Sequence, residues 1–325
     1  MKKSQKIKWG IIGAGRIAAK FASDLSTSKN GELIAVASTS LHRAQDFALK
    51  FNAEHAFGTY EEIFSTEVEA IYIATPHTFH KEHTLMCLER GIAVLCEKPF
   101  GMNEEEVIEM ISMAREKKVF LMEALWTRFI PSTLKTLELI ESGAIGEVVT
   151  IHADFGFSAE YDPEARLFNM KLGGGAFLDI GIYPAFLSLL ILGYPSRIQA
   201  TSTFSPTGSD VTTSFIYAYD NSATAVLNCT VASETLSEAV IYGTKGHIVL
   251  HKRFHEARKL TLIQAGKEEQ VFDFSRETFG YDYEIEEVNQ CLLQGKTESE
   301  LMPLSFSQKL IHLLDRTREA AGIHY

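Results

Sequence analysis

The sequence predicts an α/β protein in which a doubly wound parallel sheet is followed by an α+β domain with a large, mostly antiparallel sheet. The parallel sheet is predicted because apolar, β-branched runs alternate with helical patterns over the first third of the chain. The second sheet is predicted because short apolar runs separated by turn signals follow one another between residues 197 and 274. A chain of 325 residues is long for one core. We therefore expect two domains, at 1–122 and 123–325.

In the first domain, short buried strands alternate with amphipathic helices. The helix beginning at Asn103 shows the signals most clearly, with Asn103 as its cap, acidic residues in the first turn and basic residues in the last. Right-handed crossovers then make the strands parallel. We expect strands at 7–15, 32–39, 69–76, 92–99 and 119–124, and helices at 16–26, 41–52, 79–91 and 103–118.

After residue 123 the alternation stops. A helix at 133–143 and a strand at 146–157 precede a glycine-rich stretch with its own helix, and two helices at 283–295 and 304–322 close the chain. The strands between them form a meander with one buried face. They are expected at 197–204, 211–219, 223–231, 238–243, 246–250, 259–264 and 270–274.

Composition excludes several classes of protein. The formal net charge of −11 argues against a nucleic-acid binder. The longest apolar stretch, 173–193, contains Asp179, Pro184 and several glycines, so we expect no membrane span. The four cysteines have neither CxxC nor metal-ligand spacing, which indicates reduced thiols and no metal site. We expect a soluble, cytoplasmic protein.

The first chemical signal is the GxGxxA pattern of Gly13, Gly15 and Ala18, directly after a strand and opening a helix. The first glycine allows a tight turn, the second lets a pyrophosphate approach the backbone, and the small third residue lets the helix pack on the strand. Arg16 and Ile17 stand at the helix N-terminus, whose N–H groups attract the anion. The pattern predicts a Rossmann dinucleotide site.

The end of the second strand bears on which dinucleotide binds. NAD-binding domains usually place an acid there, whereas this chain has Ser38, Thr39 and Ser40, with Arg43 one helical turn away. Hydroxyls and a guanidinium suit a 2′-phosphate, so we predict NADP in preference to NAD. The alternative is that Ser40 only caps the helix and Arg43 is a solvated surface charge.

Further candidates follow the next two strands, because ligands bind at the carboxyl ends of parallel strands. Thr75 and Pro76 would line the cofactor, with His77 and His80 near the nicotinamide ribose; alternatively, His80 and His83 are ordinary residues at a helix start. Glu97 and Lys98 end the strand at 92–99 above the same edge. Their alternative is a structural charge pair or a lysine that extends to solvent.

Asp179 and Tyr183 are the candidates in the second domain. They are four residues apart, so on a helix they share one face, and three glycines precede them. Glycines let the backbone pack closely or approach a ligand. A buried tyrosine and a capping aspartate remain the structural alternative.

Together, the glycine motif, "EKP" at 97–99 and "GGGAFLDIGIY" at 173–183 resemble the glucose–fructose oxidoreductase / inositol dehydrogenase / MocA family over essentially the whole chain. Tyr183, with "MEALWTRFIP" at 122–131, is more similar to the dimeric dihydrodiol dehydrogenase branch. The resemblance implies that Lys98 and Tyr183 are the catalytic pair, that Asp179 orients a substrate hydroxyl or the lysine, and that NADP(H) is the cofactor.

The resemblance implies a dehydrogenase or reductase for a sugar, polyol or vicinal diol. A tyrosine has a pKa of about 10, and an ammonium close to it favours the phenolate, so we expect Lys98 to meet Tyr183 and tune its proton exchange. Trp126, Arg128 and Phe157 are candidate substrate residues. Phe155 and Phe279 would extend an apolar wall, although phenylalanines are more often core.

Two other functions stay open. A protein of this fold could bind NADP(H) as a regulatory sensor without turnover, although such proteins typically lack the catalytic pair. The exposed face of the large sheet could instead serve interaction, and we expect a homodimer or homotetramer through it.

Overall fold

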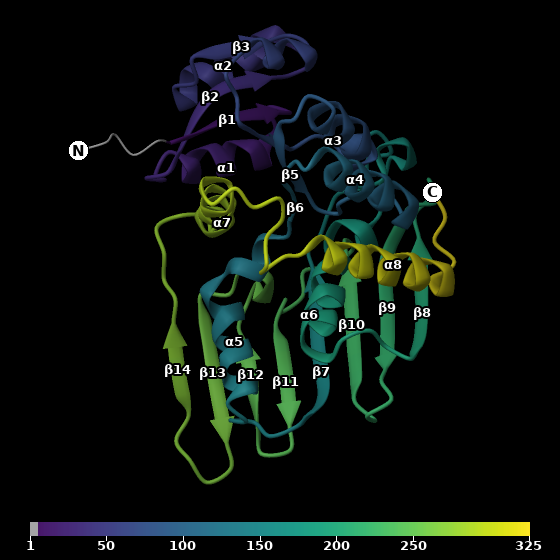
Figure 1. Ribbon diagram of the computed structural model, residues 1–325. Coiled ribbons are helices and arrows are strands. Elements are labelled where there is room, and N and C mark those ends of the chain that lie inside the picture. Colours follow the sequence, from purple (N-terminus) through teal and green to yellow (C-terminus); the bar gives the residue numbers. More distant parts are fainter. Residues whose placement is uncertain (1–5) are drawn as a thin grey trace, which may run out of the picture. The chain divides into compact units, whose positions relative to one another are not determined.

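The computed structural model describes residues 6–325, which form two compact units (Figure 1). The first unit takes the chain up to Trp126 together with Arg276–Gln308, and the second takes Thr127–Ser275 and Lys309–Tyr325. The sequence-based division at 122 and 123 treats the domains as consecutive, whereas the chain returns to the first unit before it ends. It returns because α7 (Asp282–Leu293) packs against α1 (Arg16–Leu25) and the first two strands.

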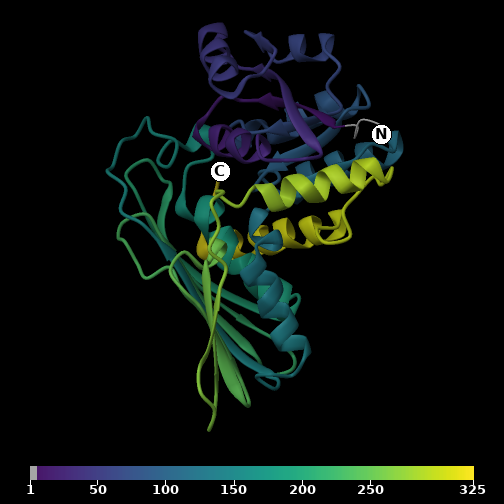
Figure 2. The ribbon, with the colours of Figure 1, turned by 90° about the vertical axis from the view of Figure 1, so that its left-hand side faces the viewer.

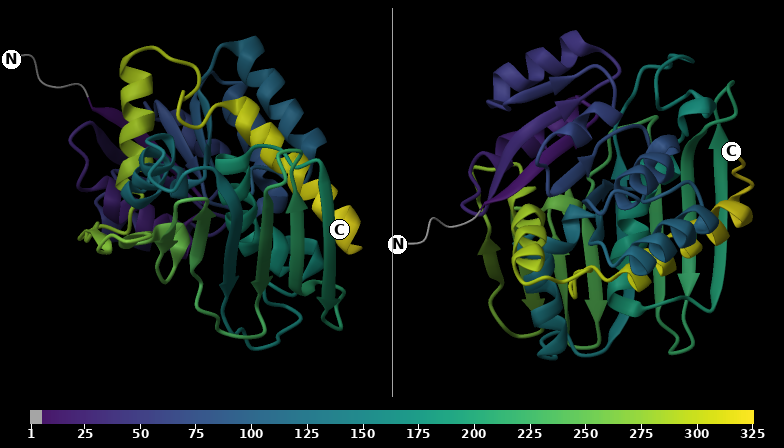
Figure 3. Two further views of the ribbon diagram at one scale, coloured as in Figure 1. Left: turned by 90° about the horizontal axis from the view of Figure 1, so that it is seen from below. Right: turned by 45° about the horizontal axis from the view of Figure 1, so that its top comes forward.

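Sheet A of the first unit is wholly parallel, as predicted (Figure 3). Its strand order is β3-β2-β1-β4-β5-β6, so the order reverses between β1 and β4, which is where doubly wound sheets bind ligands. The short edge strand β3 was not predicted, because three residues carry too little pattern. The strands are β1 (Ile7–Ile12), β2 (Gly31–Ala37), β3 (His55–Phe57), β4 (Ala70–Ile73), β5 (Ala93–Glu97) and β6 (Leu121–Ala124).

The helices of the first unit begin where the capping residues predict. Asn103 caps its helix by accepting the N–H of Glu106 at 3.0 Å, and Ser40 accepts the N–H of Arg43 at 3.4 Å. These helices are α1, α2 (Leu41–Phe51), α3 (His80–Leu88), α4 (Glu104–Lys117) and α7, with single turns at Glu61–Ser65 and His77–Phe79.

A buried carboxylate fixes the returning segment in the first unit. Asp24, in α1, accepts the backbone N–H groups of Phe279, Gly280 and Tyr281 at 2.9–3.0 Å. Farther along α7, Asn289 accepts the indole N–H of Trp9 at 2.9 Å. These bonds satisfy groups that would otherwise be buried without a partner.

Sheet B of the second unit has eight strands in the order β14-β13-β12-β11-β7-β10-β9-β8 (Figure 3). Only β7 and β10 run parallel, so the predicted mostly antiparallel sheet is confirmed. Its strands are β7 (Val148–Gly156), β8 (Arg197–Phe204), β9 (Asp210–Ala218), β10 (Thr224–Thr230), β11 (Ala239–Gly243), β12 (Gly246–Leu250), β13 (Lys259–Gln264) and β14 (Gln270–Asp273).

One face of sheet B carries the core of this unit. The side chains that alternate inward are fully or nearly fully buried, among them Ile151, Phe215, Leu227 and Ile241. Figure 2 shows α5 (Pro131–Glu141) and α6 (Ile182–Leu192) on one side of the sheet. The last helix, α8 (Leu304–Ala321), joins this unit from Lys309 onward, where the Tyr217 hydroxyl lies 2.7 Å from that of Thr317.

One segment within residues 6–325, Met170–Leu192, is long and apolar enough to cross a membrane by length and composition alone. Buried residues make up 78% of its most apolar window, and α6 packs against β7 and β10. The core helix of a soluble protein has the same properties, so the run is weak evidence for a membrane span.

The four cysteines, Cys87, Cys96, Cys229 and Cys291, are buried free thiols. The cytoplasmic location that their spacing suggested stays a prediction.

Candidate active site

The glycine turn between β1 and α1 has the geometry that a dinucleotide phosphate requires. Gly13 has a φ of +101°, and a Cβ there would lie 2.8 Å from the carbonyl oxygen of Ala74. Gly15 precedes α1, and a Cβ on it would meet nothing within 4 Å, so its backbone is open to approach. Arg16 and Ile17 are exposed at the helix start, while Ala18 is fully buried. These residues fit a bound pyrophosphate.

The end of β2 carries the polar groups predicted to select the dinucleotide. The Arg43 guanidinium donates to the Thr39 hydroxyl at 2.9 Å, and both side chains are exposed. Ser38 is buried, and its hydroxyl lies 3.4 Å from the backbone nitrogen of Ser40. Ser40 also caps α2, so the capping alternative is correct for that residue. Thr39 and Arg43 therefore form the exposed pair able to meet a phosphate.

In the segment after β4, His80 is hydrogen-bonded within the fold, next to the candidate cofactor residues Thr75, Pro76 and His77. His80 is buried, with Nδ1 2.8 Å from the carbonyl oxygen of Pro99 and Nε2 3.0 Å from that of Thr75. Burial lowers the pKa of His80 to about 3, so the ring is neutral near pH 7 and its single N–H can donate to only one of these two carbonyls. Thr75 also pairs its hydroxyl with Nδ1 of His83 at 3.0 Å. His80 thus lies between the ends of two neighbouring strands and donates to one of them, while Pro76 and the buried His77 complete this segment.

Glu97 and Lys98 end β5, where the sequence placed them. The Tyr72 hydroxyl donates to Oε1 of Glu97, and the backbone N–H of Lys98 donates to Oε2 at 3.2 Å. Burial, and then the charge of Glu97, hold the pKa of Tyr72 well above its usual range, so its proton stays available to donate. Glu97 is thus held structurally, and Lys98 is half-buried at the strand end.

The segment that carries Asp179 and Tyr183 is not a single α-helix. Phe177–Gly181 is π-helical, and α6 begins at Ile182. Pro184 has no N–H to give to the carbonyl of Ile180, which helps to explain the departure from the α pattern. The shared face predicted for Asp179 and Tyr183 therefore assumes a helical geometry that this segment does not have.

Two side chains that the sequence analysis missed hold this π-helix. Asp210 accepts the N–H of Phe177 at 2.7 Å, and Arg166 donates to Oδ2 of Asp179 at 2.9 Å. Burial raises the pKa of Asp210 to about 6. Gly175 lies against this carboxylate with a φ of +141°. Only the fold brings these residues together, and no local sequence signal marks them.

Tyr183 is buried in a cluster of aromatic rings from the second unit. Its ring centroid lies 5.6 Å from that of Phe155 and 4.7 Å from that of His255, and Phe155 and His255 stack at 4.2 Å. Phe157 continues the cluster 6.5 Å from Phe155. His255, in a single helical turn at Phe254–Glu256, was not predicted, because a lone histidine between two strands carries no signal. The cluster confines the tyrosine ring to a largely apolar environment.

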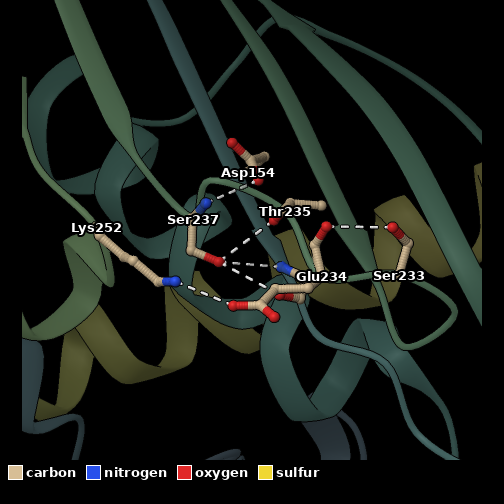
Figure 4. Close-up of polar contacts among 7 residues, drawn as sticks. Asp154, Ser233, Glu234, Thr235, Ser237 and Lys252 are labelled. Atoms are coloured by element: carbon tan, nitrogen blue, oxygen red, sulfur yellow. Dashed lines mark hydrogen bonds and ion pairs between the residues drawn. The ribbon is translucent and has the colours of Figure 1, made fainter.

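A polar network fixes the end of β7, which carries Phe155 and Phe157. Figure 4 shows Asp154 accepting the N–H of Ser237, at 3.1 Å, while the Ser237 hydroxyl approaches Thr235 at 3.3 Å. Gly156 joins through its backbone, since its N–H donates to the Ser237 hydroxyl at 3.3 Å. The network holds the loop after β10 against β7 and so sets where the aromatic cluster begins.

The remaining predicted substrate residues are divided between the units. Trp126 stacks on Tyr281 at 4.7 Å in the first unit, whereas Arg128 lies in the second. Phe279 belongs to the first unit, half exposed, with the Lys20 ammonium 5.5 Å from its ring centroid. Phe155 and Phe157 are therefore the two predicted wall residues that share the cluster of Tyr183.

Across residues 6–325, no group of three or more histidine, cysteine, aspartate or glutamate side chains is arranged to hold a metal ion.

Two family models match this chain. The model described as an oxidoreductase family with an NAD-binding Rossmann fold matches residues 7–125, and that of the GFO/IDH/MocA C-terminal domain matches residues 133–249. The matches confirm the predicted dinucleotide-binding domain, and each lies within one of the two units.

The chain also has named relatives along its whole length. It is 37% identical over 334 residues to trans-1,2-dihydrobenzene-1,2-diol dehydrogenase from Mus musculus and 34% identical over 329 residues to that from Homo sapiens, with 98% of each chain covered in both cases.

Solved structures of similar fold include a 3-ketoreductase from Actinomadura kijaniata in complex with NADP and TDP-benzene, with a TM-score of 0.88 at 23% identity. An aldose-aldose oxidoreductase from Caulobacter crescentus, complexed with glycerol, has a TM-score of 0.89 at 20% identity. Each comparison covers 98% of both chains. They confirm the predicted architecture.

Gly175→Ala is expected to lower the free energy of unfolding by about 2 kcal/mol or more, because it combines a strained φ with a steric clash. The new Cβ would lie 2.1 Å from Oδ1 of Asp210 and 2.8 Å from the Tyr325 hydroxyl. Gly193→Ala is the matched control, since its φ of +78° is also strained but nothing lies within 4 Å. Denaturant unfolding measures both variants, and equal losses would contradict the packing argument.

Proposed function

Because the chain belongs to the GFO/IDH/MocA oxidoreductase family, we propose that it is an NADP(H)-dependent dehydrogenase or reductase of a sugar, polyol or vicinal diol. Membership confirms the resemblance drawn from the sequence, and the named relatives are dehydrogenases. The observation that carries the proposal is the buried phenol of Tyr183 in its aromatic cluster.

In this proposal, bound nicotinamide supplies or accepts a hydride at the substrate carbon, and the protein handles the proton at its oxygen. Tyr183 exchanges that proton through its hydroxyl. A tyrosine in an apolar cluster resists ionisation, so it needs a cation to reach the phenolate. Lys98 at the end of β5 is the cation assigned to this task, and the proposal requires the two units to bring it to Tyr183.

Asp179 is proposed to orient a substrate hydroxyl. Its carboxylate is mostly buried and paired with Arg166, whose own side chain is partly exposed. An ion pair of this kind holds a carboxylate in one orientation, which positions its second oxygen for a hydroxyl donor.

The substrate class follows from the ring cluster and from the relatives. Phe155, Phe157 and His255 offer flat, mainly apolar faces, which suit the face of a sugar ring or an aromatic diol. Relatives at 34–37% identity are named for a dihydrobenzene diol. A regulatory sensor without turnover is disfavoured, because Lys98 and Tyr183 are both present and these relatives are named as enzymes.

The preference for NADP rests on the end of β2. Among the residues that begin the connection there, Ser38, Thr39 and Ser40, none is acidic, and Arg43 bonds to Thr39. A guanidinium there suits a 2′-phosphate, and no carboxylate is present to accept a ribose hydroxyl.

Tyr183→Phe and Lys98→Met are each expected to lower kcat by about 100-fold or more while the Kd for NADPH changes by less than about threefold, because they remove proton handling and not dinucleotide contacts. Turnover is followed by nicotinamide absorbance with a panel of ketoses, aldoses and diols. Tyr194→Phe, a half-exposed tyrosine, is the control. Wild-type turnover in Tyr183→Phe would end the assignment.

Arg43→Ala is expected to raise KM for NADPH by about tenfold and to leave KM for NADH nearly unchanged, because only NADPH has the 2′-phosphate. Lys50→Ala, at the other end of the same helix, removes a similar exposed charge and should change neither value. Parallel assays with both dinucleotides measure the ratio, and an equal change for both would show that Arg43 does not select the cofactor.

We also propose that two copies of the chain pair through the outer face of sheet B. Ile216 and Val226 stand opposite each other on β9 and β10 and are 42% and 44% exposed, and His152 continues the same row on β7. Exposed apolar side chains in one row of a broad sheet favour association with an identical face. A homotetramer would need a further interface.

The double variant Ile216→Glu/Val226→Glu is expected to elute as a monomer, because like charges would face each other across a twofold interface. Size-exclusion chromatography with light scattering measures the mass. Leu236→Glu, which changes an exposed apolar residue in the loop after β10, is the control and should leave the mass unchanged. A wild-type protein that is itself monomeric at micromolar concentration would contradict the proposal.

A further inference from the structure

A buried carboxyl group lies behind the turn that carries Lys98. Glu123 is on β6, directly opposite Cys96 of β5, and is 2% exposed. Its Oε1 accepts the backbone N–H of Phe100 at 3.1 Å. Phe100 is two residues beyond Lys98, so this bond closes the far side of the turn. The proposed mechanism gives Glu123 no part.

Further contacts of the same turn lie within the first unit. The carbonyl of Pro99 faces Nδ1 of His80 at 2.8 Å, and the N–H of Lys98 reaches Glu97 at 3.2 Å. The neutral His80 has one N–H, which donates either to this carbonyl or to that of Thr75. Among these contacts, the bond from Glu123 is made to a backbone N–H that follows Lys98 in the chain, that of Phe100.

The surroundings of Glu123 decide whether it is charged. Its neighbours are Cys96 and Glu97 in β5, Lys98 directly after that strand, and Ser307 in α8. Burial raises the pKa of Glu123 to about 7 and ionised Glu97 adds to the rise, while the N–H of Phe100, the Ser307 hydroxyl and the Lys98 ammonium oppose it. The Ser307 hydroxyl lies beside the carboxyl without reaching hydrogen-bond geometry, and Oε2 makes no hydrogen bond within residues 6–325.

We propose that Glu123 is a positioning residue for Lys98: its carboxylate fixes the turn through the N–H of Phe100, and the turn loosens when that carboxylate takes up a proton. A charged acceptor binds an N–H about twice as strongly as a neutral one. The negative charge also favours the ammonium form of Lys98. The inference rests on the proposed role of Lys98.

The pH dependence has a definite sign. Above about pH 7 Glu123 is ionised, the turn is held and kcat is at its plateau. As the pH falls through this value the carboxyl takes up a proton and kcat falls. The affinity for the dinucleotide should not change with it, because the bond from Glu123 holds Phe100 and not the glycine turn.

Two substitutions distinguish the effect of the negative charge of Glu123 from the effect of its hydrogen bond to Phe100. Glu123→Gln keeps an oxygen acceptor for Phe100 without a titrating charge, so its kcat should be lower than wild type at pH 8 and should lose the limb near pH 7. Glu123→Ala leaves the N–H of Phe100 without a partner, and kcat should fall by about 100-fold at every pH with the Kd for NADPH unchanged. Partial rescue in Glu123→Gln is expected.

Asn289→Ala is the matched control. It leaves another buried donor of the first unit, the Trp9 indole N–H, without its acceptor. It should lower stability while the pH profile of kcat stays that of the wild type. If Asn289→Ala and Glu123→Ala changed the pH profile of kcat in the same way, the cause would be a general loss of stability, and the proposal would be overturned.

A crystal structure of Glu123→Ala supplies a readout that does not depend on the catalytic assignment. The backbone of residues 98–100 should move by about 1 Å or more, a shift large enough to impair chemistry. An unmoved turn, or a limb near pH 7 retained in Glu123→Gln, would overturn the proposal. The turnover of Lys98→Met distinguishes a failure of the role proposed for Lys98 from a failure of the role proposed for Glu123. If Lys98→Met has normal turnover, the proposed function of Lys98 is wrong, and the position of the turn in the crystal structure still tests Glu123.

Discussion

The hydrogen bonds between the parallel strands of sheet A are the constraint on which the dinucleotide side of this protein depends. They place Ile12 opposite both Ala37 and Ile73, and Ile73 opposite Cys96, so β1, β2 and β4 end at one level and β5 ends one residue beyond it. A shift in this register would move the residues beyond each strand end to different heights. The glycine turn and the turn of Lys98 share one edge of the sheet because the register is fixed.

Burial governs the electrostatics around that edge. Glu97, Glu123 and Glu284 are all buried in the first unit, and burial raises the pKa of Glu123 and of Glu284. Three buried carboxylates with full charge would be costly. Glu97 keeps its place through the Tyr72 hydroxyl and the N–H of Lys98, whereas the oxygens of Glu284 make no hydrogen bond within residues 6–325 and burial holds its pKa well above the usual range. The fold thus concentrates negative charge near Lys98 without ionising every acid.

In the second unit, an irregular helical turn positions the candidate site residues Asp179 and Tyr183. The π-helical turn between Gly175 and α6 carries Asp179, and it is held from outside by Asp210 and Arg166. The N–H of Phe177 is among the first of this helical run, where no helix supplies a partner, so Asp210 of β9 accepts it, while Arg166 from a loop holds the Asp179 side chain. Tyr183 follows directly, so its orientation depends on bonds made by residues far away in the chain.

The sequence by itself determined the strand and helix pattern, the glycine turn, the caps at Ser40 and Asn103 and the family resemblance, because each can be recognised in short stretches of consecutive residues. It could not give Glu123 on Phe100 or Asp210 on Phe177, pairs separated by 23 and 33 residues, nor the stacking of His255 on Phe155. Nor could it give the return of residues 276–308 to the first unit. Such contacts exist only after strand order and loop paths are set, and it is burial in the folded chain that turns ordinary acids and a lone histidine into parts of a site.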